Sequence, residues 1–217
     1  MPAARDPAAE FDGKPERNPR AQESAEKRIF HAAVDLFAAR GFAATGIRQI
    51  AEVVGVTTAT LYYYARTKDD LLLAIMQSGL SELLDEARAA VGKAVDPGER
   101  VRNLVGVHVR FGALNPSRAK VIDNEFQWLE GSYRAAIVAL RDDYEALWSV
   151  AIEDGISSRI FWPRTPAFAR LALLEMCNGV AHWYRRDGST SIAEIVAAYQ
   201  EMALAILTPS SNYPLSP

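Results

Sequence analysis

Hydroxyl-bearing side chains are concentrated in one short stretch of this chain. Within residues 57–64, six of the eight side chains are Thr or Tyr, and Leu61 is the single clear aliphatic anchor. Successive side chains on a helix turn by roughly 100°, so Tyr62, Tyr63 and Tyr64 cannot all face inward. Thr and Tyr hydroxyls suit phosphate oxygens, and Thr methyls or Tyr rings suit the thymine methyl group of a major groove. A short structural helix with exposed tyrosines accounts for the composition equally well.

The residues before this stretch predict the elements that position it. A first helix ends at Gly41, and a second begins after Thr45, which is predicted to be its N-cap. Gly55 permits a left-handed turn, and Thr57 caps a short helix over 58–64. A helix, a tight turn with Gly and a second helix is the layout of a helix-turn-helix. Apolar residues recur at helical spacing as Ile29, Ala32, Ala33, Leu36 and Phe37, and then as Ile47, Ile50, Ala51 and Val54.

Residues for catalysis or metal binding are scarce. His31, His108 and His182 are the only histidines and lack metal-ligand spacing, and the single cysteine, Cys177, has no base near it in sequence. The chain also has no Gly-rich phosphate loop and no nucleophile elbow. We therefore expect no enzyme activity, no catalytic residue, no metal and no cofactor.

Charge is distributed unevenly along the chain. The net charge of −3 combines 4 Lys/Arg with 5 Asp/Glu in residues 1–23, 6 with 3 in residues 24–68, and 14 with 19 in residues 69–217. A basic head thus precedes an acidic body. Basic charge favours nucleic acid as a partner of the head, although chance produces differences of this size in many soluble proteins.

The rest of the chain reads as helix, and no strand alternation is evident. We predict an all-α fold of about nine helices, including one across 168–186 that ends at Gly188 and a last one that opens at Ser191. The longest internal charge-free stretch, Val53–Ala65, is shorter than the ~18 residues of a membrane helix, so no membrane partner is expected. The single cysteine cannot form an internal disulfide, which favours a reducing, cytoplasmic location. The predicted boundaries are a disordered tail over 1–22, a helix-turn-helix domain over 23–68, a larger ligand-binding and dimerisation domain over 69–207, and a loose tail over 208–217.

The helix-turn-helix region resembles the N-terminal domain of the TetR/AcrR family of transcriptional regulators. The resemblance covers about residues 24–75 and rests on Thr45, Ile50-Ala51, Gly55-Val56, Leu61-Tyr62-Tyr63 and Lys68-Asp69-Asp70-Leu71-Leu72 at fixed spacing. It implies that the 58–64 helix enters the major groove of double-stranded DNA, with Thr58, Ala59 and Tyr62 nearest to base edges. It further implies phosphate contacts from Thr45, Thr57, Tyr63, Tyr64 and Lys68.

Arg48 is a further phosphate candidate, and a solvated arginine explains it equally well. Three positions depart from the commonest family pattern: Ala59 replaces a usual Gly, Tyr64 a frequent His and Ala65 a frequent Phe. The reading helix itself carries no formal charge. We therefore expect few base-specific hydrogen bonds and more readout through apolar contact and DNA shape.

Two apolar stripes near the C-terminus predict a homodimer, because helix-turn-helix proteins bind twofold half-sites as dimers. Inward packing of both stripes is the alternative, and resemblance to the family's four-helix interface favours the dimer. The predicted interface residues are Leu173, Met176, Gly179, Val180 and Trp183, together with Ile192, Ile195, Tyr199 and Ile206.

Polar and aromatic side chains on otherwise apolar helix faces predict a small-molecule pocket in the body. For each one, a satisfied polar group in the core is the competing explanation. The candidates are His108, Phe111, Asn115, Phe126, Trp128, Tyr144, Trp148, Glu175, Asn178 and His182.

Asn178 followed by the run from His182 to Gly188 resembles the TetR subset that regulates lipid and steroid breakdown and senses acyl-CoA thioesters. The expected function is accordingly a ligand-relieved repressor that acts as a homodimer on a palindromic operator. Its inducer would be a small apolar or acyl-CoA-like metabolite, and the helix that begins at Lys68 would couple the ligand to the DNA-binding head. A dimeric small-molecule-binding protein without DNA binding is the alternative.

Overall fold

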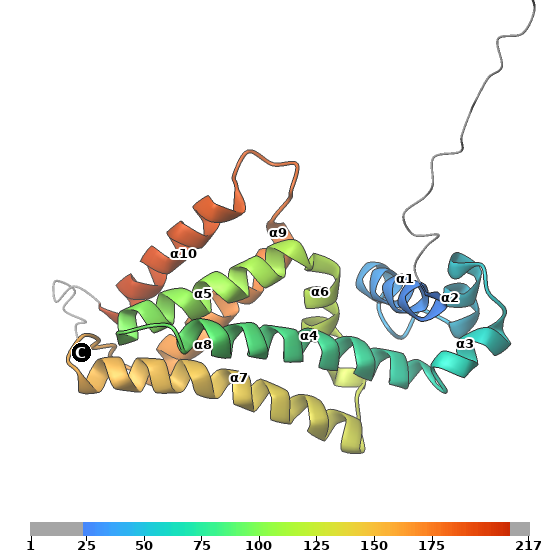
Figure 1. The fold of residues 1–217 in the computed structure, drawn as a ribbon, viewed down its shortest axis with the longest axis horizontal. Helices are drawn as coiled ribbons and strands as arrows, with labels where there is room; N and C mark the ends of the chain where they lie inside the picture. The colour runs from blue at the N-terminus through green and yellow to red at the C-terminus, as the bar shows by residue number, and fades with distance from the viewer. Residues whose placement is uncertain (1–23, 209–217) are drawn as a thin grey trace, which may run out of the picture.

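The chain folds entirely into helices over the part that the structure describes. The computed structural model describes residues 24–208 of the 217-residue chain, and this part contains no strand. It holds nine helices if the short α9 is counted with α8, which confirms the all-α prediction (Figure 1). The tail predicted over 1–22, and all of the predicted C-terminal tail except Thr208, lie outside the described residues. The elements are α1 (Ala25–Arg40), α2 (Ile47–Val54), α3 (Thr58–Tyr64), α4 (Lys68–Val91), α5 (Pro97–Leu114), α6 (Pro116–Asn124), the 3-10 helix η2 (Phe126–Trp128), α7 (Gly131–Ser157), α8 (Pro166–Asn178), α9 (Val180–Trp183) and α10 (Ile192–Leu207).

The first three helices form a small head around a shared apolar core. Side chains from all three are buried there, including Ile29, Phe37, Ile50 and Leu61. Packing of these faces supplies most of the stability of such short helices, because isolated helices of seven or eight residues are marginal in water.

The turn between α2 and α3 is a Schellman-type helix end. Gly55 adopts φ 73° and ψ 37°, the left-handed region that glycine enters without a Cβ clash. The Val56 N–H donates to the Ala51 carbonyl at 3.0 Å, and the Gly55 N–H donates to the Glu52 carbonyl at 3.1 Å. The Thr57 hydroxyl then accepts from the Thr60 N–H and caps α3, as the sequence predicts. These contacts fix the direction in which α3 leaves α2.

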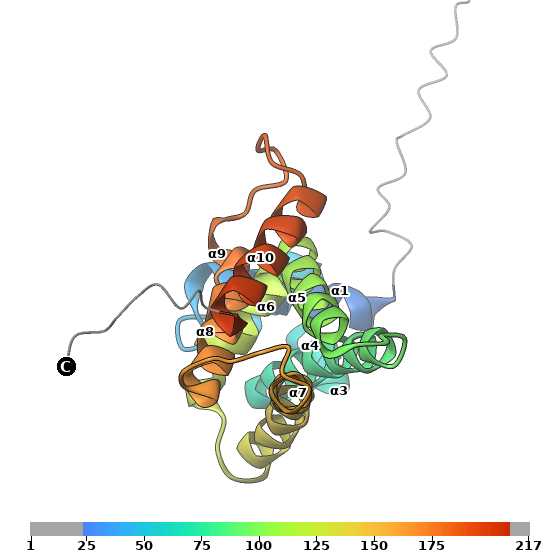
Figure 2. The ribbon, with the colours of Figure 1, turned by 90° about the vertical axis from the view of Figure 1, so that its left-hand side faces the viewer.

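The long helix α4 begins in the head and runs into the body. It starts at Lys68 with a capping box between Thr67 and Asp70, and it packs against α5, α6 and α7 (Figure 1). Helix α5 lies in the middle of the body, where it contacts α4, α7, α8 and α10. The end-on view shows α7 below α5 and α10 to the upper left of it (Figure 2).

The helix predicted across 168–186 is shorter than expected. It begins at Pro166, is interrupted at Gly179 and ends at Trp183, so Arg185 and Arg186 lie beyond its last turn. Tyr184 is extended, and the Arg186 guanidinium donates to the Leu114 carbonyl at 2.5 Å. The segment 184–191 therefore forms a loop that projects from the body between α9 and α10 (Figures 1 and 2).

Candidate functional site

Helix α3 presents a polar and aromatic face at the tip of the head. The side chains of Tyr62, Tyr63 and Tyr64 are 49%, 84% and 42% exposed, whereas Leu61 is fully buried. The rings of Tyr63 and Tyr64 pack edge to face with centroids 5.1 Å apart. Ala59 is also exposed, and Thr58 is half-buried at the start of the same helix. The face available to a partner is thus built from hydroxyls, a methyl group and aromatic rings.

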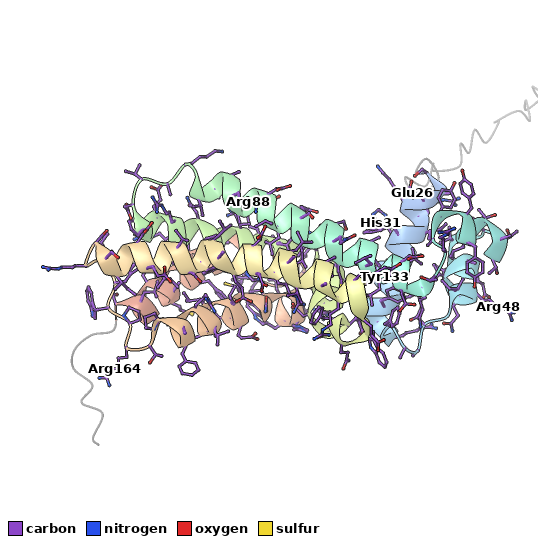
Figure 3. All side chains as sticks on the ribbon, turned by 90° about the horizontal axis from the view of Figure 1, so that it is seen from below. Glu26, His31, Arg48, Arg88, Tyr133 and Arg164 are labelled. Atoms are coloured by element: carbon purple, nitrogen blue, oxygen red, sulfur yellow. The ribbon has the colours of Figure 1, made fainter. Side chains whose placement is uncertain are left out.

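Arg48 extends this surface on the neighbouring helix α2. Its side chain is exposed, and Figure 3 shows it at the head end of the molecule, far from Arg164 at the other end. Thr57 is exposed as well, and its hydroxyl lies 2.8 Å from the Thr60 hydroxyl. Both residues can contact a molecule that approaches α3 from solvent.

Thr45 is placed differently from its sequence prediction. Its side chain is 1% exposed, and its hydroxyl donates to the Gly41 carbonyl at 2.8 Å. The N-cap of α2 is Gly46 rather than Thr45, because Gly46 is the first residue outside the helix and its N–H donates to the Gln49 side chain at 2.8 Å. The Thr45 hydroxyl therefore holds the α1–α2 loop together and does not lie on the exposed face.

Lys68 is half-buried beneath the same loop. Its ammonium group donates to the carbonyls of Phe42 and Thr45 at 2.8 and 3.1 Å, and it lies 4.1 Å from the centroid of the Phe42 ring. An ammonium group has three N–H donors. One donor of Lys68 is left for a partner outside the chain.

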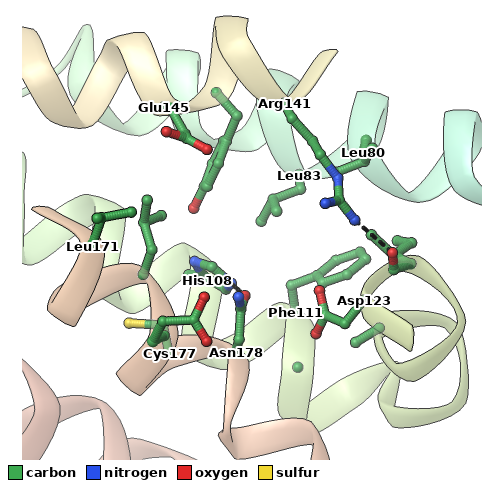
Figure 4. A pocket seen from close by; sticks show the side chains of 16 residues that line it. Leu80, Leu83, His108, Phe111, Asp123, Arg141, Glu145, Leu171, Cys177 and Asn178 are labelled. Atoms are coloured by element: carbon green, nitrogen blue, oxygen red, sulfur yellow. Dashed lines mark hydrogen bonds between the residues drawn. The ribbon is translucent and has the colours of Figure 1, made fainter. Parts of the chain in front are cut away.

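The body contains a cavity of about 150 Å³ that is walled by five helices, α4 to α8 (Figure 4). Five of the ten candidate pocket residues line it: His108, Phe111, Tyr144, Glu175 and Asn178. The sequence reading missed the other lining residues, which are Leu80, Leu83, Gly112, Ala119, Ile122, Asp123, Arg141, Glu145, Leu171, Leu174 and Cys177.

The remaining five candidates lie elsewhere. Asn115 is at the α5–α6 junction and lines a different hollow, and His182 is exposed on α9. Trp148 is fully buried, with its ring centroid 6.4 Å from those of both His108 and Tyr144, so it supports the pocket wall without lining the cavity. Phe126 and Trp128 belong to η2: the Arg141 guanidinium lies over the Phe126 ring, and Trp128 lies against Phe42 of the head.

Two buried polar groups in the pocket lack partners. The His108 Nε2 lies 2.8 Å from the Asn178 side-chain oxygen, and burial lowers the pKa of His108 to about 4, so the ring is neutral at pH 7. Because that amide oxygen only accepts, Nε2 carries the proton and Nδ1 presents a lone pair. Within residues 24–208, neither His108 Nδ1 nor the Tyr144 hydroxyl has a hydrogen-bond partner. Burial also raises the pKa of the Tyr144 phenol and raises that of the Cys177 thiol to about 12, so both stay protonated.

Charged side chains form one end of the pocket. Arg141 donates to the Ile122 carbonyl at 2.6 Å, as the dashed line in Figure 4 shows. Burial raises the pKa of the Asp123 carboxyl to about 6, with Arg141 opposing this shift and Glu175 adding to it. The sequence did contain a signal for Arg141 and Glu145, which are charged and lie one helical turn apart. They were missed because the predicted pocket residues were chosen mainly among uncharged polar and aromatic side chains.

The predicted dimer residues divide into a buried group and an accessible group. Leu173, Val180 and Ile195 are buried within the chain itself. These three therefore pack inward, as in the alternative to a dimer interface. Met176, Gly179, Ile192, Tyr199 and Ile206 are half-buried, and Trp183 is half exposed. Large apolar side chains that the prediction did not include, Phe168 and Met202, are 70% and 49% exposed on α8 and α10.

Two hydrogen bonds lie where the head meets the body, in addition to the continuous helix α4, the packing of α1 against α6 and the contact of Trp128 with Phe42. The Phe42 N–H donates to Glu125, at the C-terminal end of α6, at 3.1 Å. The Tyr133 hydroxyl at the start of α7 donates to Asp70 at 2.5 Å, and this bond lowers the pKa of the Asp70 carboxyl. The pocket helices α6 and α7 are therefore hydrogen-bonded to the segments that carry the head.

A helix-turn-helix head on a helical body with an internal cavity defines a class of proteins, the ligand-responsive DNA-binding regulators. Residues 94–207 match the family described as tetracyclin repressor-like, C-terminal domain, and residues 29–75 match the bacterial regulatory proteins of the tetR family. The chain belongs to the TetR family of transcriptional regulators.

Similar proteins with names include regulators of steroid metabolism. The HTH-type transcriptional repressor KstR2 of Rhodococcus jostii is 25% identical over 182 residues, which cover 83% of this chain and 89% of the relative. A crystal structure of a tetR-family regulatory protein from Rhodococcus RHA1 is 28% identical with a TM-score of 0.80, and the match covers 86% of this chain and 98% of that one. The structure of AibR in complex with isovaleryl coenzyme A and operator DNA is 25% identical with a TM-score of 0.74, over 82% of this chain and 97% of that one.

Within the described residues there is neither a membrane-spanning helix nor a group of metal-binding side chains. No helix between residues 24 and 208 is long and apolar enough to cross a membrane. No three His, Cys, Asp or Glu side chains in the same part of the chain are grouped so that they could hold a metal ion.

Proposed function

We propose that this protein is a ligand-relieved repressor that acts as a homodimer on a palindromic operator. The observation that carries the proposal is the exposed Thr/Tyr face of α3, held at the tip of the head by the Gly55 turn and the Thr57 cap. Helix α3 would enter the major groove, and the head over 23–68 and the body over 69–207 would act as separate reading and sensing domains. The match to the family supports this arrangement.

The proposed DNA contacts follow the exposure of the side chains. Thr58, Ala59 and Tyr62 would face base edges, and Arg48, Thr57, Tyr63 and Tyr64 would contact phosphates, with Lys68 offering its remaining N–H donor. The Thr45 side chain is left out of this set because it is buried. Since α3 carries no formal charge, the readout would depend on apolar contact and DNA shape more than on bidentate hydrogen bonds.

The proposed effector site is the cavity between α4 and α8. The effector would be a small apolar compound or an acyl-CoA-like compound. The structure of the relative AibR, which holds isovaleryl coenzyme A, supports the second class. A ligand there would act on the head through α4 and through the Glu125 and Tyr133 contacts. Because coupling between two ligands is reciprocal, DNA and effector would weaken each other's binding by the same factor.

The uncharged reading helix is the one observation that favours the alternative of a dimeric small-molecule-binding protein without DNA binding. The family consists of regulators rather than enzymes, and the absence of enzyme activity in this chain remains a prediction.

A gel-shift titration with the DNA upstream of the protein's own gene tests the proposal. The Arg48→Ala variant should bind about fivefold more weakly than wild type, because one phosphate contact is lost. Arg102→Ala removes the same charge from an exposed position on α5 and should bind like wild type. If wild-type protein shows no preference for the upstream DNA over unrelated DNA, the ligand-binding alternative replaces the repressor proposal.

A further inference from the structure

The lining of the pocket contains more carboxylates than cations. Asp123, Glu145 and Glu175 line it together with a single cation, Arg141. Glu145 is paired at 3.6 Å with Arg170, which lies outside the lining. Among the ion pairs formed within residues 24–208, none includes Asp123 or Glu175. Two carboxylates therefore face the pocket without a cationic partner.

Arg141 forms no ion pair with Asp123 or Glu175 and makes its closest contacts elsewhere, although its charge still favours the ionised form of Asp123. It donates to the Ile122 carbonyl, and its guanidinium carbon lies 4.3 Å from the centroid of the Phe126 ring. Burial still raises the pKa of Asp123 despite the positive charge of Arg141, and the negative charge of Glu175 raises it further. A partly compensated carboxylate in a pocket wall is stabilised by any cation that enters the cavity.

The deeper wall of the pocket independently points to a hydrogen-bond donor as ligand. His108 and Tyr144 are only 7% and 5% exposed, and the His108 Nδ1 lone pair and the Tyr144 hydroxyl have no partner in the described part of the chain. Unpaired buried polar atoms are costly, so a ligand that supplies the missing hydrogen bonds gains affinity. An acceptor nitrogen and partly compensated carboxylates in the same lining favour N–H groups on that ligand.

The apolar part of the lining and the volume of the cavity indicate that the rest of the ligand is apolar and small. Leu80, Leu83, Phe111, Ile122 and Leu174 provide apolar surface. A cavity of about 150 Å³ is large enough for a benzene-sized molecule. A bare metal ion does not fit this description, because no three potential ligands in residues 24–208 are grouped to share one.

We propose that the pocket binds a small organic cation, with an ammonium group facing Asp123 and Glu175 and a compact apolar body against the leucines of α4 and α8. The proposal rests on the proposed function, in which this cavity is the effector site. It favours a small compound over the acyl-CoA-like class and adds a positive charge to that compound, because the phosphates of a coenzyme A thioester would meet carboxylates at the same wall. The aromatic ring of Tyr144 in the lining adds cation–π attraction for an ammonium group, whereas the Phe111 ring already carries the Arg118 guanidinium over it.

Three probes with the same ring and different charge test the proposal on the full-length protein. Benzylamine, benzyl alcohol and benzoate are titrated separately by calorimetry at pH 7.5, and isovaleryl coenzyme A is titrated in parallel. Benzylamine should have the lowest Kd, about tenfold below that of benzyl alcohol, and benzoate should bind most weakly. Asp123→Asn should raise the Kd of benzylamine about tenfold and leave that of benzyl alcohol unchanged.

Two further variants keep the result interpretable. Glu175→Gln changes an exposed side chain at the pocket, so it should fold normally and also weaken benzylamine binding. Asp85→Asn removes the same charge from an exposed position on α4 outside the pocket and should have no effect.

The proposal is overturned if benzoate or isovaleryl coenzyme A binds more tightly than benzylamine, if no probe binds, or if both pocket variants bind benzylamine like wild type. Operator binding by the same preparation is measured separately. Operator binding without a preference for the amine defeats only the ligand class, whereas amine binding without operator binding defeats the repressor proposal and leaves the pocket assignment in place.

Discussion

Lys68 has a structural task in addition to the phosphate contact that the family resemblance implies. Two of its three N–H donors are used by the carbonyls of Phe42 and Thr45, and its ammonium group lies over the Phe42 ring. Phe42 in turn is bonded to Glu125 of the body. Lys68 therefore fixes the loop between α1 and α2 against the first turn of α4, at the point where the head meets the body.

The Lys68→Met variant separates the two tasks. Met retains an apolar stem near Phe42 but removes the charge and the donors, so we expect the free energy of unfolding to fall by about 2 kcal/mol. The slope of log affinity against log salt should become less steep by about 1, as for one lost phosphate contact. Urea unfolding and salt-dependent operator titrations measure the two effects, with Lys93→Met, exposed beyond α4, as control. Unchanged stability with weaker DNA binding would show that the two carbonyl contacts contribute nothing to folding.

Residue-level prediction from the sequence succeeded where a local rule decides the outcome. Thr57 caps α3 because a Thr before a helix accepts from the N–H three residues on. The same rule was wrong for Thr45, whose hydroxyl finds a carbonyl within its own loop while Gly46 occupies the N-cap position. The helical spacing of Arg141 was visible in the sequence, but its meeting with Asp123 in one pocket was not, because that depends on how α6 and α7 both pack against α4 and α5.

At the scale of elements, the turn between α2 and α3 determines where the reading helix points. Gly55 lies at φ 73°, and a Cβ there would meet no atom within 4 Å, so backbone conformation alone decides the effect of a substitution. We expect Gly55→Ala to lower the free energy of unfolding by about 1 kcal/mol, and Gly55→Asn to lower it less, because Asn tolerates the left-handed region.

Thermal unfolding and operator titration of both variants measure these effects. Operator affinity should fall with Ala more than with Asn, since relief of the strain shifts α3 relative to α2. Equal stability of the Ala and Asn variants would contradict the assignment of the effect to the left-handed backbone.

The number and type of the helices could be predicted because period, caps and glycines agree along most of the chain. The end of the α8–α9 helix could not be predicted, because the chain leaves the helix after Trp183 to place Arg186 against the carbonyl of Leu114, a contact between distant segments. Likewise, the link from α6 to the head through Glu125 and Phe42 joins residues 83 positions apart. Contacts of this kind follow from tertiary packing and not from local pattern.

At the scale of the whole molecule, one uncovered apolar surface lies on the last helices. On α8 and α9, Phe168, Met176 and Trp183 follow helical spacing, and on α10 Tyr199 and Met202 do the same. Phe168, Trp183 and Met202 are each about half exposed or more, and the rings of Trp183 and Tyr199 lie 6.4 Å apart, which joins the two helices into one surface. Contiguous apolar surface on a soluble chain marks an interface, and we propose this surface as the dimer contact.

Met202→Arg places a charge at the centre of that surface without touching the core, since Met202 is half exposed. Burying an unpaired charge opposes association, so we expect the dimer dissociation constant to rise more than tenfold while helicity and unfolding of the monomer stay unchanged. Val95→Arg, at an 89% exposed position beyond α4, is the matched control and should leave the dimer intact. Sedimentation equilibrium at micromolar concentration measures both variants. Because each head reads one half-site, the Met202→Arg variant should also lose cooperative binding to a palindromic operator. If Met202→Arg still forms a stable dimer, the dimer interface lies on another face of the body.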